Sequence, residues 1–264
     1  DVLLNPRQSF KTNSDSLQAT VKADLGTVEL TSYSQYRKDL SPYYGDLDAT
    51  ALPLFNISVG VNAETWSQEF VVNSKAGSPL QWTAGVNYFQ IRDTWTIGAS
   101  FGGSPYMPFG GSSTTTKSYA AFLDATYEVN DRLFVTVGGR YGHDEVQDGY
   151  FLTNFSTTGY SGPDGSFIPF TGAPGTKIAT DTLKNDNFSP RVVLRYKPSD
   201  LSSIYASFTR GYKAGILNVG GFSQQPVKPE KINAYEVGYK YETRAFQANL
   251  AGYYYNYKNL QVSS

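Results

Sequence analysis

The sequence contains no cysteine, a single histidine and a single methionine among its 264 residues. Without cysteine the chain cannot form a disulfide framework, a cysteine-ligated zinc or iron–sulfur centre, or a thiol nucleophile. One histidine excludes a multi-histidine metal site, and no serine with nucleophile-elbow spacing accompanies it. We therefore expect no metal, no cofactor and no enzymatic activity.

Charge and long apolar runs are also scarce. Charged residues make up 17% of the chain and the formal net charge is −1, so no overall field would attract nucleic acid. No apolar run approaches the roughly 18 residues of a transmembrane helix, and no signal peptide is visible. Because the chain begins at Asp1 rather than at Met, we expect it to be an internal or mature segment.

Aromatic residues, in contrast, are abundant, with 21 Tyr and 16 Phe, and the apolar residues recur with a period of two. Between 119 and 129 every second residue is Tyr, Ala, Leu or Val, and the intervening positions are mainly polar. Segments 17–25, 80–88 and 235–241 alternate in the same way. A period of two predicts β-strands with one apolar and one polar face, and no stretch shows the stripe of a helix.

Ten strands are predicted, and their connections alternate in length. The strands cover 16–25, 27–37, 59–74, 80–92, 116–129, 132–144, 187–197, 201–213, 231–242 and 245–258. Short joints lie at Gly26, 75–79, 130–131, 198–200 and 243–244. The segments at 38–58, 93–115, 145–186 and 214–230 are long and rich in Gly, Pro, Ser and Thr. This alternation predicts an up-and-down antiparallel sheet with every long loop at one end.

Such a sheet is typical of a transmembrane β-barrel. Backbone amides in lipid must be paired internally, so only helices and closed barrels can span a membrane. Barrel strands need about 9–11 residues to cross and carry aromatic girdles at both interfaces. The alternative is a soluble β-sandwich or propeller, in which strands of about five or six residues would be expected. The predicted strands are about twice that length.

Several segments of the C-terminal third resemble one family of barrels. They are NFSPR at 187–191, LRYKP at 194–198, IYASFTRGYK at 204–213, VKPEKI at 227–232 and AYEVGYK at 234–240. Residues 67–70 and 82–89 fit the same pattern more loosely. Together these motifs are similar to the barrel of TonB-dependent outer-membrane receptors, from about residue 59 to the end of the chain. Residues 1–58 share only the general sequence pattern of that family and contain none of these motifs.

The resemblance implies a receptor for TonB-coupled uptake of a scarce nutrient, of the siderophore-iron, cobalamin or oligosaccharide class, in the outer membrane of a Gram-negative bacterium. It also implies a plug domain inside a 22-strand barrel, with the TonB-ExbB-ExbD complex as partner. The sequence shows no plug, so we expect residues 1–264 to be part of the barrel wall. A passive porin-like channel and a soluble β-rich carbohydrate-binding protein or enzyme remain alternatives.

Substrate contacts are expected near the long loops, where a nutrient would enter. Arginine and lysine there could pair with an anionic siderophore, and aromatic rings could stack on a sugar or catechol. The candidates are Arg92, Trp95, Tyr141, His143, Arg210, Tyr212 and Lys213. The structural alternative for each is a girdle aromatic or a charge that faces the phosphates of lipopolysaccharide, which together with membrane lipid is a further expected partner.

Four other charges are predicted to be structural. Glu236 and Lys240 lie four residues apart on the polar parity of one strand. Charges in a barrel wall need partners, so we expect both residues to pair across strands with Arg191 or Arg195.

Overall fold

The computed structural model describes residues 8–104, 107–152, 159–161, 167–169, 176–217 and 226–262. Within these ranges the only regular secondary structure is β-strand. The described residues contain no helix that is long and apolar enough to cross a membrane.

The strands form one antiparallel sheet in which neighbours in sequence are neighbours in space. They are β1 (Ser9–Phe10), β2 (Asn13–Asp24), β3 (Val28–Asp46), β4 (Phe55–Ser74), β5 (Leu80–Phe101), β6 (Met107–Asn130), β7 (Leu133–Leu152), β10 (Thr176–Ser199), β11 (Ser202–Lys213), β12 (Glu230–Glu242) and β13 (Gln247–Lys258). The two-residue strand β1 and the longer β2 share one edge of β3. A separate hairpin consists of β8 (Gly159–Ser161) and β9 (Phe167–Pro169). The prediction of an all-β, antiparallel, up-and-down fold is confirmed.

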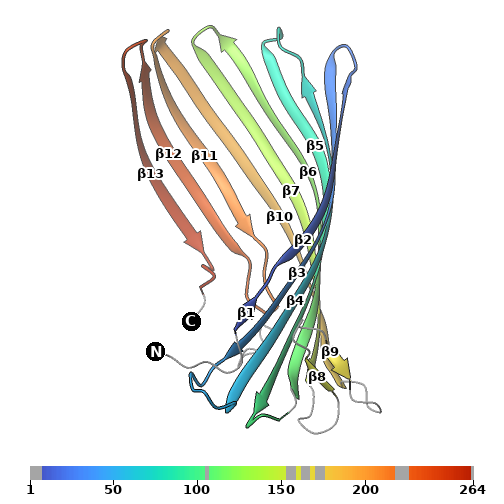
Figure 1. The fold of residues 1–264 in the computed structure, drawn as a ribbon. Coiled ribbons are helices and arrows are strands. Elements are labelled where there is room, and N and C mark those ends of the chain that lie inside the picture. The colour runs from blue at the N-terminus through green and yellow to red at the C-terminus, as the bar shows by residue number, and fades with distance from the viewer. Residues whose placement is uncertain are drawn as a thin grey trace.

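Tight turns join the strands at one end of the sheet, and the longer connections start from the other end, where the first and last described residues also lie (Figure 1). All five predicted short joints are present. Gly26 adopts a φ of 86°, which favours glycine, and its N–H donates to the Asp24 carboxylate at 2.8 Å. In another turn, the Asn130 side chain accepts from the N–H groups of Arg132 and Leu133 at 3.0 Å.

Three of the four predicted long loops are shorter than expected, because the strands continue into them. β3 and β4 leave only 47–54 between them, β5 and β6 only 102–106, and β7 extends to Leu152. Gly, Ser and Thr are frequent in the extensions at 93–101 and 107–115. Cross-strand backbone pairing shows that these segments belong to the strands. As a result β4, β5, β6, β7 and β10 have 20, 22, 24, 20 and 24 residues. These strands are about twice as long as the roughly 9–11 residues that a β-strand needs to cross a bilayer.

One face of the sheet is apolar and has no second layer packed against it. Directly paired residues share a face, and one cross-strand row consists of Ala125, Val137, Val192, Phe208, Tyr235 and Tyr254. Leu123 on this face is 52% exposed and Val237 is 59% exposed. Among the described residues the buried hydrophobic side chains are only Ala99, Ala120 and Val146, so the sheet encloses no hydrophobic core.

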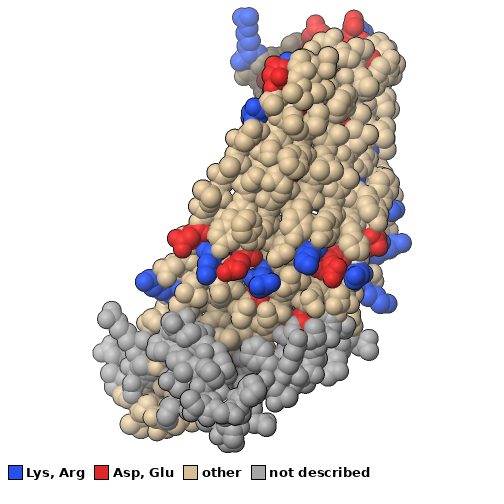
Figure 2. Space-filling model, turned by 90° about the vertical axis from the view of Figure 1, so that its right-hand side faces the viewer, with Lys and Arg blue, Asp and Glu red and all other residues tan. Residues whose placement is uncertain are grey.

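The sheet is strongly curved (Figure 1), and the charge-poor surface of Figure 2 identifies its convex face as the apolar one. Figure 2 views the molecule from the convex side and shows a broad band with almost no charged side chains, which ends in a belt of Lys, Arg, Asp and Glu near the loop end. The opposite face carries Asp124, Arg191, Glu236 and Lys240 at the level of this band. The polar parity therefore lines the concave side.

Candidate binding surface on the concave face

An ion pair that spans three strands organises the centre of the concave face. Arg191 Nη1 donates to Asp124 Oδ2 at 2.8 Å. The two residues lie on β10 and β6, and both are in register with Gly138 on the intervening strand β7. A Cβ at Gly138 would overlap the Asp124 carboxylate. Glycine at this position therefore lets the ion pair pass over β7.

The four predicted structural charges all lie on the concave face, but their partners differ from the expected ones. Arg191 pairs with Asp124, and the Arg195 guanidinium lies over the Phe134 ring, 4.2 Å from its centroid. Glu236 accepts a hydrogen bond from the Tyr205 hydroxyl, and Lys240 Nζ lies 5.7 Å from the centroid of the same ring. The expected pairing of Glu236 or Lys240 with Arg191 or Arg195 is thus wrong, because closer partners on adjacent strands satisfy each charge.

A polar cavity opens on the concave face where β10 and β11 separate. Their direct pairing begins at Arg191 and Thr209, and on the loop side of these residues the two strands are no longer in register. The cavity has a volume of about 300 Å³. Its lining residues are Ser118, Arg140, Gly142, Asp144, Asn187, Ser189, Tyr212 and Ala214.

The cavity offers polar groups that the described part of the protein leaves available. The Tyr212 hydroxyl is buried and has no hydrogen-bond partner among the described residues. Arg140 Nη2 donates to the Asn87 side chain at 3.2 Å, while Asn187 donates to Ser189 at 2.6 Å. A cation, a carboxylate and a free hydroxyl therefore line one small recess. A polar solute with both donors and acceptors fits this arrangement.

The seven candidate residues fall on both faces and do not form one cluster. Register places Arg92, Tyr141, His143 and Arg210 on the convex parity and Trp95 and Lys213 on the concave parity, while Tyr212 lines the cavity. On the convex side, Tyr141 and His143 both bind Asp186 Oδ1, at 2.7 and 2.9 Å. Arg210 donates to Asn233 at 3.1 Å.

Sequence reasoning missed the polar residues that lie inward, among them Asn87, Asp124, Arg140 and Asn187. Each follows the parity opposite to the apolar rows, so consistent use of the alternation could have placed them on the concave face. Their contacts depend on the register between neighbouring strands, which the sequence pattern does not specify. A further pair, Arg37 and Asp39, forms a salt bridge of 2.8 Å toward the loop end of the same face.

The connection at 47–54 is held by two aspartates. Asp46 Oδ1 accepts from the N–H groups of Asp48 and Ala49 at 2.9 and 3.1 Å. Asp48 accepts from the Thr50 hydroxyl and from the N–H of Phe55, the latter at 2.6 Å. The hydrogen bond from the Thr50 side chain, followed by the backbone donors, lowers the pKa of Asp48 below its ordinary value. The described residues contain no group of three or more His, Cys, Asp or Glu side chains that could hold a metal ion.

Comparisons with known proteins agree with this architecture. The chain is 29% identical over 166 residues to the pesticin receptor of Yersinia enterocolitica, a match that covers 61% of the chain and 22% of the relative. The chain thus spans about a fifth of the length of the curated relatives that it matches. The structure is similar to the ferric yersiniabactin uptake receptor FyuA from Yersinia pestis, with a TM-score of 0.79, 19% identity, and coverage of 97% of this chain and 38% of that one.

A second solved structure shows the same fold at lower sequence identity. The ferric-catecholate import receptor Fiu from Escherichia coli K12 matches with a TM-score of 0.66 and 10% identity, over 94% of this chain and 41% of that one. The model of the family described as TonB dependent receptor-like, beta-barrel matches residues 3–264. This chain therefore belongs to the TonB-dependent receptor-like β-barrel family.

Proposed function

We propose that the chain forms part of the barrel wall of an outer-membrane receptor that imports a scarce nutrient by TonB-coupled transport in a Gram-negative bacterium. The observation that carries this proposal is the separation of a charge-poor convex face from a concave face that carries Asp124, Arg191, Glu236 and Lys240, in a chain of this family. A plug supplied by another part of the receptor would occupy the concave side, and the TonB-ExbB-ExbD complex would act on that plug.

Among nutrients, we propose the ferric siderophore class. The similar structures FyuA and Fiu are a ferric yersiniabactin uptake receptor and a ferric-catecholate import receptor. The concave face of this chain offers Arg140, Lys213 and Trp95, which suit an anionic and partly aromatic chelate. Of the seven candidate residues, we propose Trp95, Tyr212 and Lys213 as substrate contacts. Trp95 and Lys213 have the concave parity, and Tyr212 lines the cavity on the concave face.

Two alternatives differ in ways that can be measured. A passive porin-like channel shares the patterning of both faces but needs no energy. A soluble β-rich binding protein or enzyme would cover its apolar face with a second layer, and the exposed convex rows of this sheet count against it. The barrel itself performs no covalent chemistry in this proposal.

Uptake by the full-length receptor in its source bacterium tests the proposal. A strain that lacks the gene is complemented with the full receptor, and accumulation of ⁵⁵Fe-loaded siderophores is measured with and without an uncoupler of the proton gradient. We expect uptake that depends on both the receptor and the gradient. Uptake that persists in the presence of the uncoupler would support the channel, and recovery of the receptor in the soluble fraction would support the third hypothesis.

A substitution tests the substrate contacts separately. In Tyr212→Phe only the unpartnered hydroxyl is lost, so we expect the apparent KM for uptake to rise about tenfold if that hydroxyl binds the chelate. Tyr119→Phe is the matched control, because Tyr119 lies on the convex face in contact with the ring of Tyr88. Equal KM values for the two variants would remove the cavity from the proposed binding surface.

A further inference from the structure

We propose that the loop-side part of the concave face recognises an ammonium group on an apolar arm of the imported chelate. Asp93 and Trp95 on β5 form this site, and aliphatic side chains of β4 and β5 surround them. The inference rests on the proposed function and deepens it, because it assigns a chemical feature to the ferric siderophore. The site is separate from the cavity at Tyr212, which neither residue lines.

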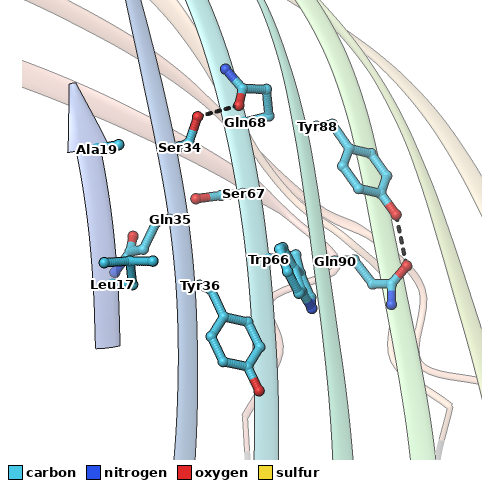
Figure 3. Close-up of a pocket in the computed structure, with 10 residues that line it drawn as sticks. All are labelled: Leu17, Ala19, Ser34, Gln35, Tyr36, Trp66, Ser67, Gln68, Tyr88 and Gln90. Atoms are coloured by element: carbon cyan, nitrogen blue, oxygen red, sulfur yellow. Dashed lines mark hydrogen bonds between the residues drawn. The ribbon is translucent and has the colours of Figure 1, made fainter. Parts of the chain in front are cut away.

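The first observation is that the apolar parity changes face at the charged belt of Figure 2. The belt crosses β4 and β5 at Glu64 and Arg92, which are in register. On the turn side of this row, Tyr36, Trp66 and Tyr88 have convex parity (Figure 3). On the loop side the concave parity carries the apolar side chains instead. They are Ile57, Val59, Val61, Trp95 and Ile97.

The convex parity of the same loop-side segments is polar. Its residues are Asn56, Ser58, Asn62, Thr94 and Thr96, with Gly60 and Gly98 among them. A surface that faces hydrocarbon would carry apolar residues at these positions, so these parts of β4 and β5 extend beyond the lipid. Their apolar concave surface therefore does not contact lipid. It lines the loop-side entrance to the concave face, where a nutrient would enter.

The second observation is a carboxylate within this apolar surface. Asp93 lies between Ile91 and Trp95 on the concave parity of β5, in register with Ala63 on β4 and Thr114 on β6. Its side chain is half-buried, and no described residue donates a hydrogen bond to it or forms an ion pair with it. Because a half-buried carboxylate without a partner is unfavourable, a cation that reaches Asp93 gains a strong interaction.

The charges in register with Asp93 make this level of the concave face acidic. The row reads Asp39, Ala63, Asp93, Thr114 and Asp148. Arg37 binds Asp39 at 2.8 Å and neutralises it. The belt cations Arg92 and Lys117 have convex parity and point to the other face. The row therefore keeps an excess of negative charge, which a positively charged ligand group complements.

Trp95 supplies a second contact for the same cation. Residues two apart on a strand share a face and lie about 7 Å apart, so an ammonium group fits between Asp93 and the indole ring. Trp95 is 38% exposed, and a cation over the face of an indole is attracted to it. Val59 and Ile97, in register with each other, continue the apolar surface toward the loops. The group that carries the ammonium is therefore apolar.

Other occupants use only part of this arrangement. A neutral aromatic ligand would contact Trp95 but leave Asp93 without a partner. A metal ion needs more ligands than Asp93 supplies, and the described residues contain no group of three or more His, Cys, Asp or Glu side chains for it. Arg140 and Lys213 lie on other strands and are available to the anionic groups of the chelate.

Two matched chelates test this inference on the purified full-length receptor. Ferrioxamine B is a ferric trishydroxamate with a pentylammonium arm, and its N-acetylated derivative has the same iron centre but no charge on the arm. Isothermal titration calorimetry in detergent gives the dissociation constant of each. We expect ferrioxamine B to bind about tenfold more tightly, because its ammonium group gains the carboxylate and the indole as partners.

Substitutions then assign the preference to the two residues. Asp93→Asn keeps the size of the side chain and removes its charge, so the two chelates should bind equally. The acetylated chelate should bind this variant as it binds the wild type, which also shows that the variant is folded. Asp15→Asn is the matched control, because it removes the same charge at the loop side of the convex face and should retain the tenfold preference.

Trp95→Leu keeps an apolar side chain but removes the indole. It should weaken the binding of ferrioxamine B more than that of the acetylated chelate. Equal weakening of both would overturn the assignment of Trp95 to the ammonium group.

Equal affinity of the wild-type receptor for the two chelates would overturn the inference, and so would a preference that persists in Asp93→Asn. Failure of both chelates to bind counts against it in the same way. Gradient-dependent import of other ferric siderophores by a receptor without the ammonium preference would contradict this inference alone. Preferential binding of ferrioxamine B without import of any siderophore by energised cells would contradict the proposed function alone.

Discussion

Glycine has a specific role on the concave face, because it leaves room for side chains of neighbouring strands. Phe122 interrupts the polar face of its strand, and its ring lies over Gly85, the residue directly opposite. The Tyr205 ring covers Gly238 in the same way, and the Asp124–Arg191 ion pair crosses Gly138. Such pairs of large side chains with glycine fix the register of strands whose polar faces contain few other constraints.

Alanine at Gly138 tests this role. The new methyl group would displace the Asp124 carboxylate and break its ion pair with Arg191, so we expect the free energy of unfolding to fall by about 1 kcal/mol, since both partners are partly exposed. Gly142→Ala on the same strand is the control, because its Cβ would meet no atom closer than 4.0 Å. Urea titration of the refolded full-length receptor measures both variants, and equal stability would show that the ion pair contributes nothing.

Asp48 provides a pH-dependent test in a connection outside the strands. Its pKa is lowered in the folded loop, so the loop gains stability above the unfolded pKa of about 3.9 and loses it as the pH falls through the folded value. Thr50→Val removes the main cause and should move the pKa of Asp48 back toward its ordinary value. Carboxyl ¹³C NMR measures that shift, and an unchanged pKa would assign the lowering to the backbone donors of Thr50 and Phe55.

At the scale of the strands, the sequence predicted turns and apolar segments well and loop-side ends poorly. All ten predicted strands exist, because an apolar face and a polar face impose a period of two on each strand. Beyond the charged belt, β5 continues from Arg92 to Phe101, and β6 begins at Met107 rather than at 116. Residues 110–116 of β6 are all Gly, Ser or Thr, so they show no alternation of apolar and polar residues from which a strand could be predicted. Only neighbouring strands reveal that these segments are paired.

The orientation of the strands predicts which connections are exposed on the cell surface. An epitope inserted between Leu52 and Pro53, in the connection at 47–54, should be stained by antibody on intact cells. The same epitope inserted at Asp200, in the turn between β10 and β11, should be stained only after the outer membrane is permeabilised. Staining of the Asp200 insertion in intact cells would mean that the two ends of the sheet are reversed.

For the whole molecule, the sequence pattern separated the two faces but did not show which candidate residues lie on the same face. Trp95 and Lys213 lie on the concave parity, whereas Arg92 and His143 lie on the convex one, although all four are near the loops. The distance of a residue from the strand end does not determine the face to which its side chain points, whereas its parity along the strand does. Neither loop proximity nor parity could predict the cavity at Tyr212, because the cavity forms where β10 and β11 lose their register.

The architecture also predicts that the same added charge destabilises the fold more on the convex face than on the concave face. Leu123→Arg places a cation on the convex face within the charge-poor band, where a hydrocarbon environment should lower the free energy of unfolding by roughly 2–4 kcal/mol. Ser207→Arg places the same side chain on the concave face, in register with Glu236. There water and an acidic partner should keep the cost below about 1 kcal/mol. Urea titration of the full-length receptor in lipid vesicles compares the two, and equal costs would mean that the convex face of this sheet does not contact lipid.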